Sequence, residues 1–116
     1  MIRAVMIAAV VLILSAGPAA AGTVTGNSLL EQCRADEKLG SEPNMVNAFR
    51  ARQCHGFASG ISTSFNRVLW CIPDDVELGQ IILVVTKHLK ENPEKLHGLA
   101  AALVVAALRE AWPCPK

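Results

Sequence analysis

Four cysteines set the strongest limit on how this chain can fold. They stand at Cys33, Cys54, Cys71 and Cys114. An even number of cysteines in a small exported domain is typical of disulfides, and sequence spacing alone allows three pairings. Domains of about this size bury only around 60 to 65% of their unfolded surface, so covalent links add stability that a modest core lacks. We therefore predict two disulfides.

Export is predicted from the N-terminal segment. Arg3 supplies a positive charge, an uncharged apolar run follows over residues 4–16, and small residues precede Gly22. The run is well short of the roughly 20 residues that span a bilayer, and small residues at this place suit signal peptidase. We expect cleavage between Ala21 and Gly22, which leaves a mature domain of residues 22–116 in the periplasm without a membrane anchor.

Apolar residues recur every three or four positions in the mature part, which predicts helices. Capping residues, prolines and glycines mark where the helices begin and end. The four expected helices cover about 28–38, 46–65, 73–92 and 92–111. No strand pattern competes, so we predict one all-α domain, a small bundle of about four helices stapled by two disulfides.

Two of the expected helices carry features that bear on packing. The apolar stripe of the second helix includes Phe49, Cys54, Phe57, Ile61, Phe65 and Val68. Gly56 and Gly60 lie one turn apart on this helix and predict close approach by a neighbouring backbone, because glycine otherwise costs helix propensity. The fourth helix is uncharged over 98–108, so we expect it at the centre of the bundle or against a second subunit.

The expected helices select one disulfide pairing. Cys33 lies about seven residues before the first turn and Cys54 about eight after the next helix starts, so both stand at similar heights in an antiparallel pair. Cys71 precedes the third helix and Cys114 follows the fourth, and the tight corner at Asn92 brings those ends together. We predict the pairs Cys33–Cys54 and Cys71–Cys114.

No pattern in the mature part predicts catalysis, a metal site or a cofactor. Cys54 and His55 are adjacent, but neighbouring helical side chains point about 100° apart and a disulfide-bonded cysteine offers no thiolate. The histidines His55, His88 and His97 lack a regular metal-binding spacing. Loss of Arg3 takes the formal net charge from +1 to zero, which argues against nucleic-acid binding. We expect a protein that is not an enzyme.

Four motifs follow one another in the mature part. They are Gly-Asn-Ser-Leu-Leu-Glu-Gln-Cys at 26–33, Cys-His-Gly-Phe-Ala-Ser-Gly at 54–60, and the segments 71–85 and 89–114, the last of which ends on Ala-Trp-Pro-Cys. In this order they resemble the four blocks of the Rap/Tai family of type VI secretion immunity proteins, whose first two read Gly-Asn-x-Leu-Leu-x-x-Cys and Cys-x-Gly-Tyr-x-x-Gly. Phenylalanine stands at position 57 where tyrosine is usual in the family. The resemblance covers almost the whole mature chain.

The resemblance implies a periplasmic immunity protein that binds and blocks a peptidoglycan amidase effector, with no catalysis of its own. Some members of the family that the chain resembles form homodimers. The apolar residues Val84, Val105 and Leu108, which lie beyond the main stripes, favour a homodimer here as well. Two alternatives stay open: a periplasmic helical binding protein with an unrelated partner, and an acid-stress chaperone-like protein. Membership of the family would predict the fold more firmly than it predicts which protein is bound.

Two loops are candidates for binding that partner. Glu42 and Asn44 lie in the first, over 40–44, and Asn66 and Arg67 lead to Trp70 in the second. Each loop is anchored by a predicted disulfide, which lowers the cost of ordering it on binding. We favour the second loop, because Arg67 can pair with acceptors in a cleft. The alternative is that both are ordinary connections and that Trp70 is part of the core.

Overall fold

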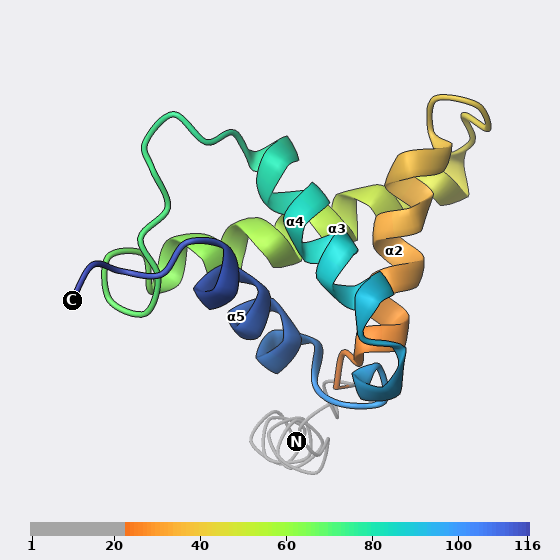
Figure 1. Ribbon diagram of the computed structural model, residues 1–116. Coiled ribbons are helices and arrows are strands. Elements are labelled where there is room, and N and C mark those ends of the chain that lie inside the picture. The colour runs from red at the N-terminus through yellow and green to blue at the C-terminus, as the bar shows by residue number, and fades with distance from the viewer. Residues whose placement is uncertain (1–22) are drawn as a thin grey trace, which may run out of the picture.

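The computed structural model describes residues 23–116, and helices form most of this part of the chain (Figure 1). In chain order the elements are α2 (Gly26–Lys38), α3 (Met45–Ser64), α4 (Leu78–Glu91), the short 3-10 helix η1 (Pro93–Lys95) and α5 (Ala100–Ala111). Residues 23–116 contain no strand, so the predicted all-α bundle of four helices is confirmed. The expected cleavage between Ala21 and Gly22 lies outside the described residues and stays a prediction.

The longest helix, α3, passes behind the other helices and joins the two ends of the molecule in Figure 1. α2 meets it at the turn over 39–44, and α4 crosses in front of it. After α5 the chain returns to the far end of α3, where the C terminus lies beside the loop that follows that helix. The chain connections before and after α3 therefore lie at opposite ends of the bundle.

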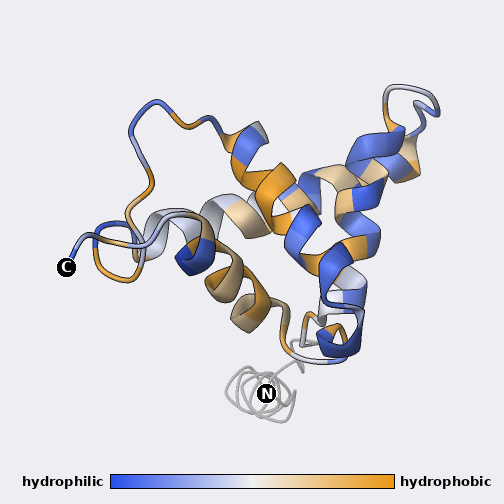
Figure 2. Cartoon of the chain, in the orientation of Figure 1, coloured by the Kyte–Doolittle hydropathy of each residue, from blue (hydrophilic) through white to orange (hydrophobic). Residues whose placement is uncertain are grey.

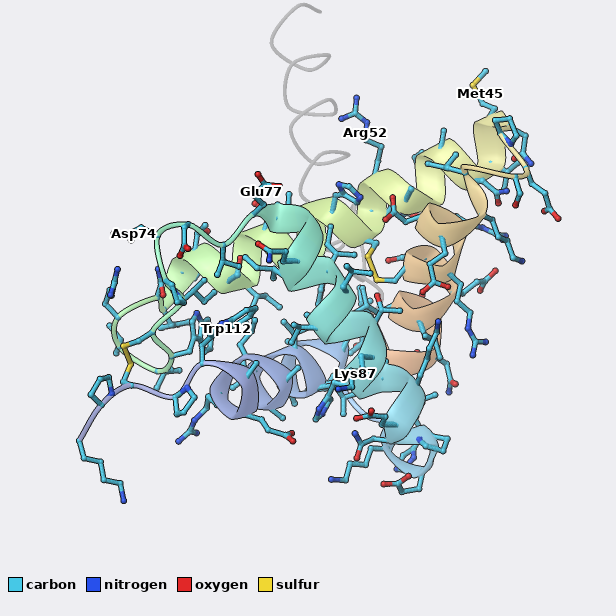
Figure 3. All side chains as sticks on the ribbon, turned by 45° about the horizontal axis from the view of Figure 1, so that its top comes forward. Met45, Arg52, Asp74, Glu77, Lys87 and Trp112 are labelled. Carbon is cyan, nitrogen blue, oxygen red and sulfur yellow. A yellow bond between two sulfur atoms is a disulfide. The ribbon has the colours of Figure 1, made fainter. Side chains whose placement is uncertain are left out.

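Both predicted disulfides are present, and Figure 3 shows them at two separate places. Cys33–Cys54 joins α2 to α3 with 5.1 Å between the Cα atoms. Cys71–Cys114 joins the segment before α4 to the tail after α5 with 4.8 Å between the Cα atoms. The amide of Cys71 also donates to the backbone oxygen of Trp112 at 2.8 Å, so the tail is held by a hydrogen bond as well.

The core combines one buried face from each helix. On α4 the predicted stripe is confirmed at Ile81, Ile82, Val85 and Leu89, whereas Leu78 at its start is partly exposed. α5 turns Leu103, Val104, Ala107 and Leu108 inward, and it exposes alanines together with Arg109 and Glu110 near its end, so it is not buried all round. In Figure 2 the hydrophobic colour gathers on α4 and α5, and α2 is largely hydrophilic.

The stripe predicted on α3 is wrong at both ends. Phe49, Phe65 and Val68 are exposed by 65%, 49% and 72%. In the middle of the stripe Cys54 is buried, and Phe57 and Ile61 are partly buried against the core. The other residues that α3 buries have short side chains: Asn47, Ala51, Ala58 and Ser62. The disulfide at Cys54 turns this face toward α2, and short side chains allow the two helices to pack closely there.

The predicted close approach at Gly56 and Gly60 is also wrong. A Cβ added at either position would meet nothing within 4 Å. The close approach occurs at Gly26 instead, where an added Cβ would overlap the side chain of Leu103 and lie 2.9 Å from the backbone oxygen of Leu96. Glycine at the start of α2 therefore allows that helix to touch the segment before α5.

Three helix starts differ from the predictions. α2 begins two residues before Ser28, because the hydroxyl of Thr25 accepts from the Ser28 amide at 3.2 Å and caps the helix. α4 begins at Leu78 and not at Pro73, because Glu77 and Gln80 form a capping box there. The residues over 73–77 are thus part of the preceding loop.

The start signal at Asn92 leads only to η1, and the last helix begins at Ala100. The reason is a long-range backbone contact between the segments 24–27 and 96–100. The amides of Gly26 and Asn27 donate to the backbone oxygens of Gly98 and Leu96 at 3.0 and 2.9 Å, and the amide of Ala100 donates to the oxygen of Val24 at 2.9 Å. Backbone groups committed to this contact cannot complete a continuous helix.

Candidate partner-binding surface

The two predicted binding loops lie at opposite ends of α3. The first precedes Met45 and the second follows Ser64, with the 20 residues of the helix between them. A helix of this length measures about 30 Å, so the two loops cannot form one compact site. A partner would contact one of them, or else cover the whole length of α3.

The second loop, which we call the Arg67 loop (residues 65–72), is fixed by its own backbone and side chains. The Oδ1 atom of Asn66 accepts from the amide of Ile72 at 3.0 Å, and the amide of Arg67 donates to the oxygen of Trp70 at 2.7 Å. Arg67 has a φ of 72°, a left-handed conformation that is uncommon for residues other than glycine. Such a conformation persists only where the surroundings determine it, so the loop is well defined before any partner arrives.

Trp70 lies beneath this loop and not on its surface. Its ring is fully buried, and its Nε1 atom donates to the backbone oxygen of Ser62 at 2.9 Å. Phe65 packs against it edge to face, with 6.2 Å between the ring centroids. The prediction that Trp70 contacts a partner is therefore wrong, because no part of the ring reaches solvent. Its role is to support the loop from inside.

The outer side of the Arg67 loop combines a cation with apolar side chains. The side chain of Arg67 is 59% exposed, and its Nη2 atom lies 2.7 Å from the Oδ1 atom of Asp74. Val68 and Leu69 follow the arginine in the chain and are exposed by 72% and 39%. Arginine is one of the residue types enriched at binding hot spots, so Arg67 is the strongest candidate for contact on this side of the loop. The sequence prediction missed Val68, because the assumed apolar stripe placed it in the core. The Asn-Arg turn before it interrupts the helix, and this turn was the signal that Val68 does not continue the stripe.

At the first loop, the predicted residues mainly organise the turn. Asn44 caps α3 by accepting from the amide of Asn47 at 2.9 Å, and the side chain of Asn47 donates to the backbone oxygen of Glu42 at 2.9 Å. The exposed groups here are apolar, since Met45, Val46 and Phe49 are all exposed by more than half. Figure 3 shows Met45 pointing away from the bundle. The sequence prediction did not identify this apolar tip.

Two histidines of the described domain lie in contacts between helices. The Nε2 atom of His55 lies 2.9 Å from the Oδ1 atom of Asp36, which ties α3 to α2, and Cys54 beside it is in the disulfide. The Nδ1 atom of His88 lies 3.5 Å from the Oε2 atom of Glu110 and links α4 to α5. Among residues 23–116 no three histidine, cysteine or acidic side chains come together as metal ligands do. This part of the chain also has no helix long and apolar enough to cross a membrane.

Comparison with known families identifies the domain. The model of the Rap1a immunity proteins matches residues 25–114, which run from the cap of α2 to the last cysteine. Among curated proteins, none matches the chain at a significant level. The matched segment contains both disulfides, all four helices and both candidate loops. The chain therefore belongs to the family of Rap1a immunity proteins.

Proposed function

We propose that this protein is a periplasmic immunity protein that binds and blocks a peptidoglycan amidase effector of the type VI secretion system. Membership of an immunity family implies that the chain binds a partner effector. The choice of an amidase and of this secretion system comes from the four motifs quoted above. The two disulfides fit a protein that folds in an oxidising compartment, as the periplasm is.

The observation that carries the proposal is the rigid, exposed Arg67 loop. An inhibitor without catalytic groups acts by occupying its target, so it needs a surface that enters or covers the active-site cleft. In this loop Asn66 and Trp70 hold the backbone, and Arg67 and Val68 face solvent. Binding by a preformed loop avoids most of the ordering cost that a flexible one would incur.

The first loop is the second candidate for contact with the effector. Glu42 and Asn44 hold its turn, and the exposed apolar side chains of Met45, Val46 and Phe49 follow it directly. Residues 40–44 contain no cation, whereas the Arg67 loop has an exposed arginine. We therefore assign it a supporting contact with the effector at most.

A homodimer is a further part of the proposal. Of the residues that suggested it, Leu108 is fully buried within its own bundle, and Val84 and Val105 are half-buried. Leu83, next to Val84 on α4, is 64% exposed and offers the apolar surface that remains. Light scattering of the mature chain at micromolar concentration tests this part, and a strict monomer would refute it.

The test of the proposed function is an inhibition assay with a peptidoglycan amidase effector of the type VI secretion system. Purified mature protein is added to the amidase, and the release of cleaved stem peptides from peptidoglycan is measured. The proposal expects inhibition that is complete near a one-to-one ratio, because a tight blocking complex titrates the enzyme. Full amidase activity in the presence of excess protein would rule it out.

A separate measurement distinguishes an immunity protein from the chaperone-like alternative. A chaperone activated by acid should expose apolar surface as the pH falls, and an immunity protein should not. Binding of an apolar fluorescent dye is measured between neutral and acidic pH under conditions where the helix content is unchanged. We expect no rise in dye fluorescence, and a strong rise would favour the chaperone.

A further inference from the structure

A groove along α2 carries positive charge that the proposed function does not use. It encloses about 400 Å³, and the buried side chains of Leu30, Ala35 and Leu96 line its bottom. One wall comes from the start of α3 at Arg50, and the other comes from the end of α4 at Lys90. The groove is thus built by three helices.

Two ion pairs fix the walls of this groove. The Nη1 atom of Arg50 lies 2.9 Å from the Oε1 atom of Glu31, which ties α3 to α2. The Nζ atom of Lys90 lies 2.8 and 3.0 Å from the two carboxylate oxygens of Glu37, which ties α4 to α2. Exposed ion pairs contribute little to stability, but these two set the positions of the Arg50 and Lys90 side chains at the walls of the groove.

The remaining positive charge lies on α2 itself. Arg34 and Lys38 line the groove one helical turn apart, and both are exposed. Neither has a carboxylate within ion-pair distance anywhere in residues 23–116. Glu31 is the one acidic residue of the lining, and Arg50 already engages it. The groove therefore presents two cations with no internal counter-charge, although the mature chain is neutral as a whole.

We propose that this groove binds an extended acidic segment of a partner protein. Residues four apart on a helix stand about 5 to 6 Å from each other at Cβ, and alternate residues of an extended chain stand about 6.6 Å apart on one face. Two carboxylates separated by one residue thus match the spacing of Arg34 and Lys38. The apolar bottom at Leu30 and Leu96 then accommodates the methylene groups of the acidic side chains.

This site is separate from the Arg67 loop. The groove reaches α3 at Asn47 and Arg50, near the start of the helix, and the Arg67 loop begins after the helix ends at Ser64. At about 1.5 Å per residue the distance along α3 exceeds 20 Å. Both surfaces can therefore be occupied at once, and the groove does not depend on the amidase proposal.

The test uses a hexaglutamate peptide, blocked at both ends and labelled with a fluorophore, and the mature protein at low salt. Fluorescence anisotropy is measured for the wild type, for Arg34→Gln/Lys38→Gln, and for Arg109→Gln/Lys116→Gln as the matched control. The control also removes two positive charges. Its two side chains lie outside the groove and have no ion pair in the described chain. Circular dichroism checks that all three proteins keep their helix content.

The groove variant should bind the peptide about tenfold more weakly than the wild type or worse, and the control should stay within about twofold of the wild type. A hexaglutamine peptide should not bind, and inorganic phosphate at the same charge concentration should not displace hexaglutamate. The proposal is overturned if wild type fails to bind hexaglutamate, if both variants weaken binding equally, or if phosphate competes as well as the peptide, which would indicate a simple anion site.

Discussion

The Nε1 atom of Trp70 donates a hydrogen bond of 2.9 Å to the backbone oxygen of Ser62, so the indole ties the Arg67 loop to the last turns of α3. Both residues are buried. Below the loop, this bond gives the buried carbonyl of Ser62 a hydrogen-bond donor. Above it, the backbone that Trp70 anchors holds Arg67 in its left-handed conformation.

Replacing Trp70 by Phe keeps an aromatic ring in the core but removes the indole N–H. The oxygen of Ser62 then loses its partner in a buried place, which costs about 1 to 3 kcal/mol in the free energy of unfolding. Urea denaturation followed by circular dichroism measures this loss. Trp112→Phe is the control, because Trp112 is only half-buried and its indole has no hydrogen bond among the described residues. Equal losses in both variants would show that the bond to Ser62 contributes little.

The disulfide Cys71–Cys114 should contribute more to stability than any single hydrogen bond. Its cysteines are 43 positions apart, so removing the link as Cys71→Ser/Cys114→Ser frees a long loop in the unfolded chain. The loop-entropy estimate gives a loss of about 4 kcal/mol. Thermal unfolding of the double variant measures it. An unfolding temperature unchanged from that of the wild type would contradict this estimate.

Two glycines form a matched pair for testing the packing. Gly26→Ala should destabilise the protein by about 1 to 3 kcal/mol, because the new methyl group overlaps Leu103 and the backbone at Leu96. Gly56→Ala should leave stability unchanged or raise it by up to about 1 kcal/mol, since its site on α3 is open and alanine favours helix. Chemical denaturation of both variants gives the comparison. The reverse order would mean that the close contact at Gly26 does not exist.

Local signals in the sequence were sufficient to predict the number of helices and the disulfide pairing. Capping residues and prolines act over short distances, so the sequence displays them directly, and the positions of the cysteines on the expected helices gave the pairing. The other contacts between distant segments could not be predicted. The backbone contact of 24–27 with 96–100 delays the last helix to Ala100, and the way α3 packs around the link at Cys54 leaves Phe49 exposed.

The same distinction applies to the candidate site. Polar residues after a helix end predict a turn, and Asn66 and Arg67 do lie in an exposed or half-exposed loop. The burial of Trp70 and the exposure of Val68 depend on how the chain turns at Arg67, whose left-handed φ is a property of the folded loop and not of arginine itself. The sequence placed Val68 wrongly in a buried stripe, and it left Trp70 open between a contact with the partner and a place in the core, of which the second is confirmed.

Binding of the effector amidase by the Arg67 loop can be tested through the affinity of two loop variants for that enzyme. Asn66→Ala/Arg67→Ala removes both polar side chains, and Arg67→Gly removes the guanidinium group while keeping a residue that tolerates the left-handed backbone. Glu94→Ala/Arg109→Ala, at exposed sites on η1 and α5, serves as the control. Calorimetry should show that the double variant binds about a hundredfold more weakly with its helix content intact, and that the control binds as the wild type does. Unchanged affinity in both loop variants would contradict the claim.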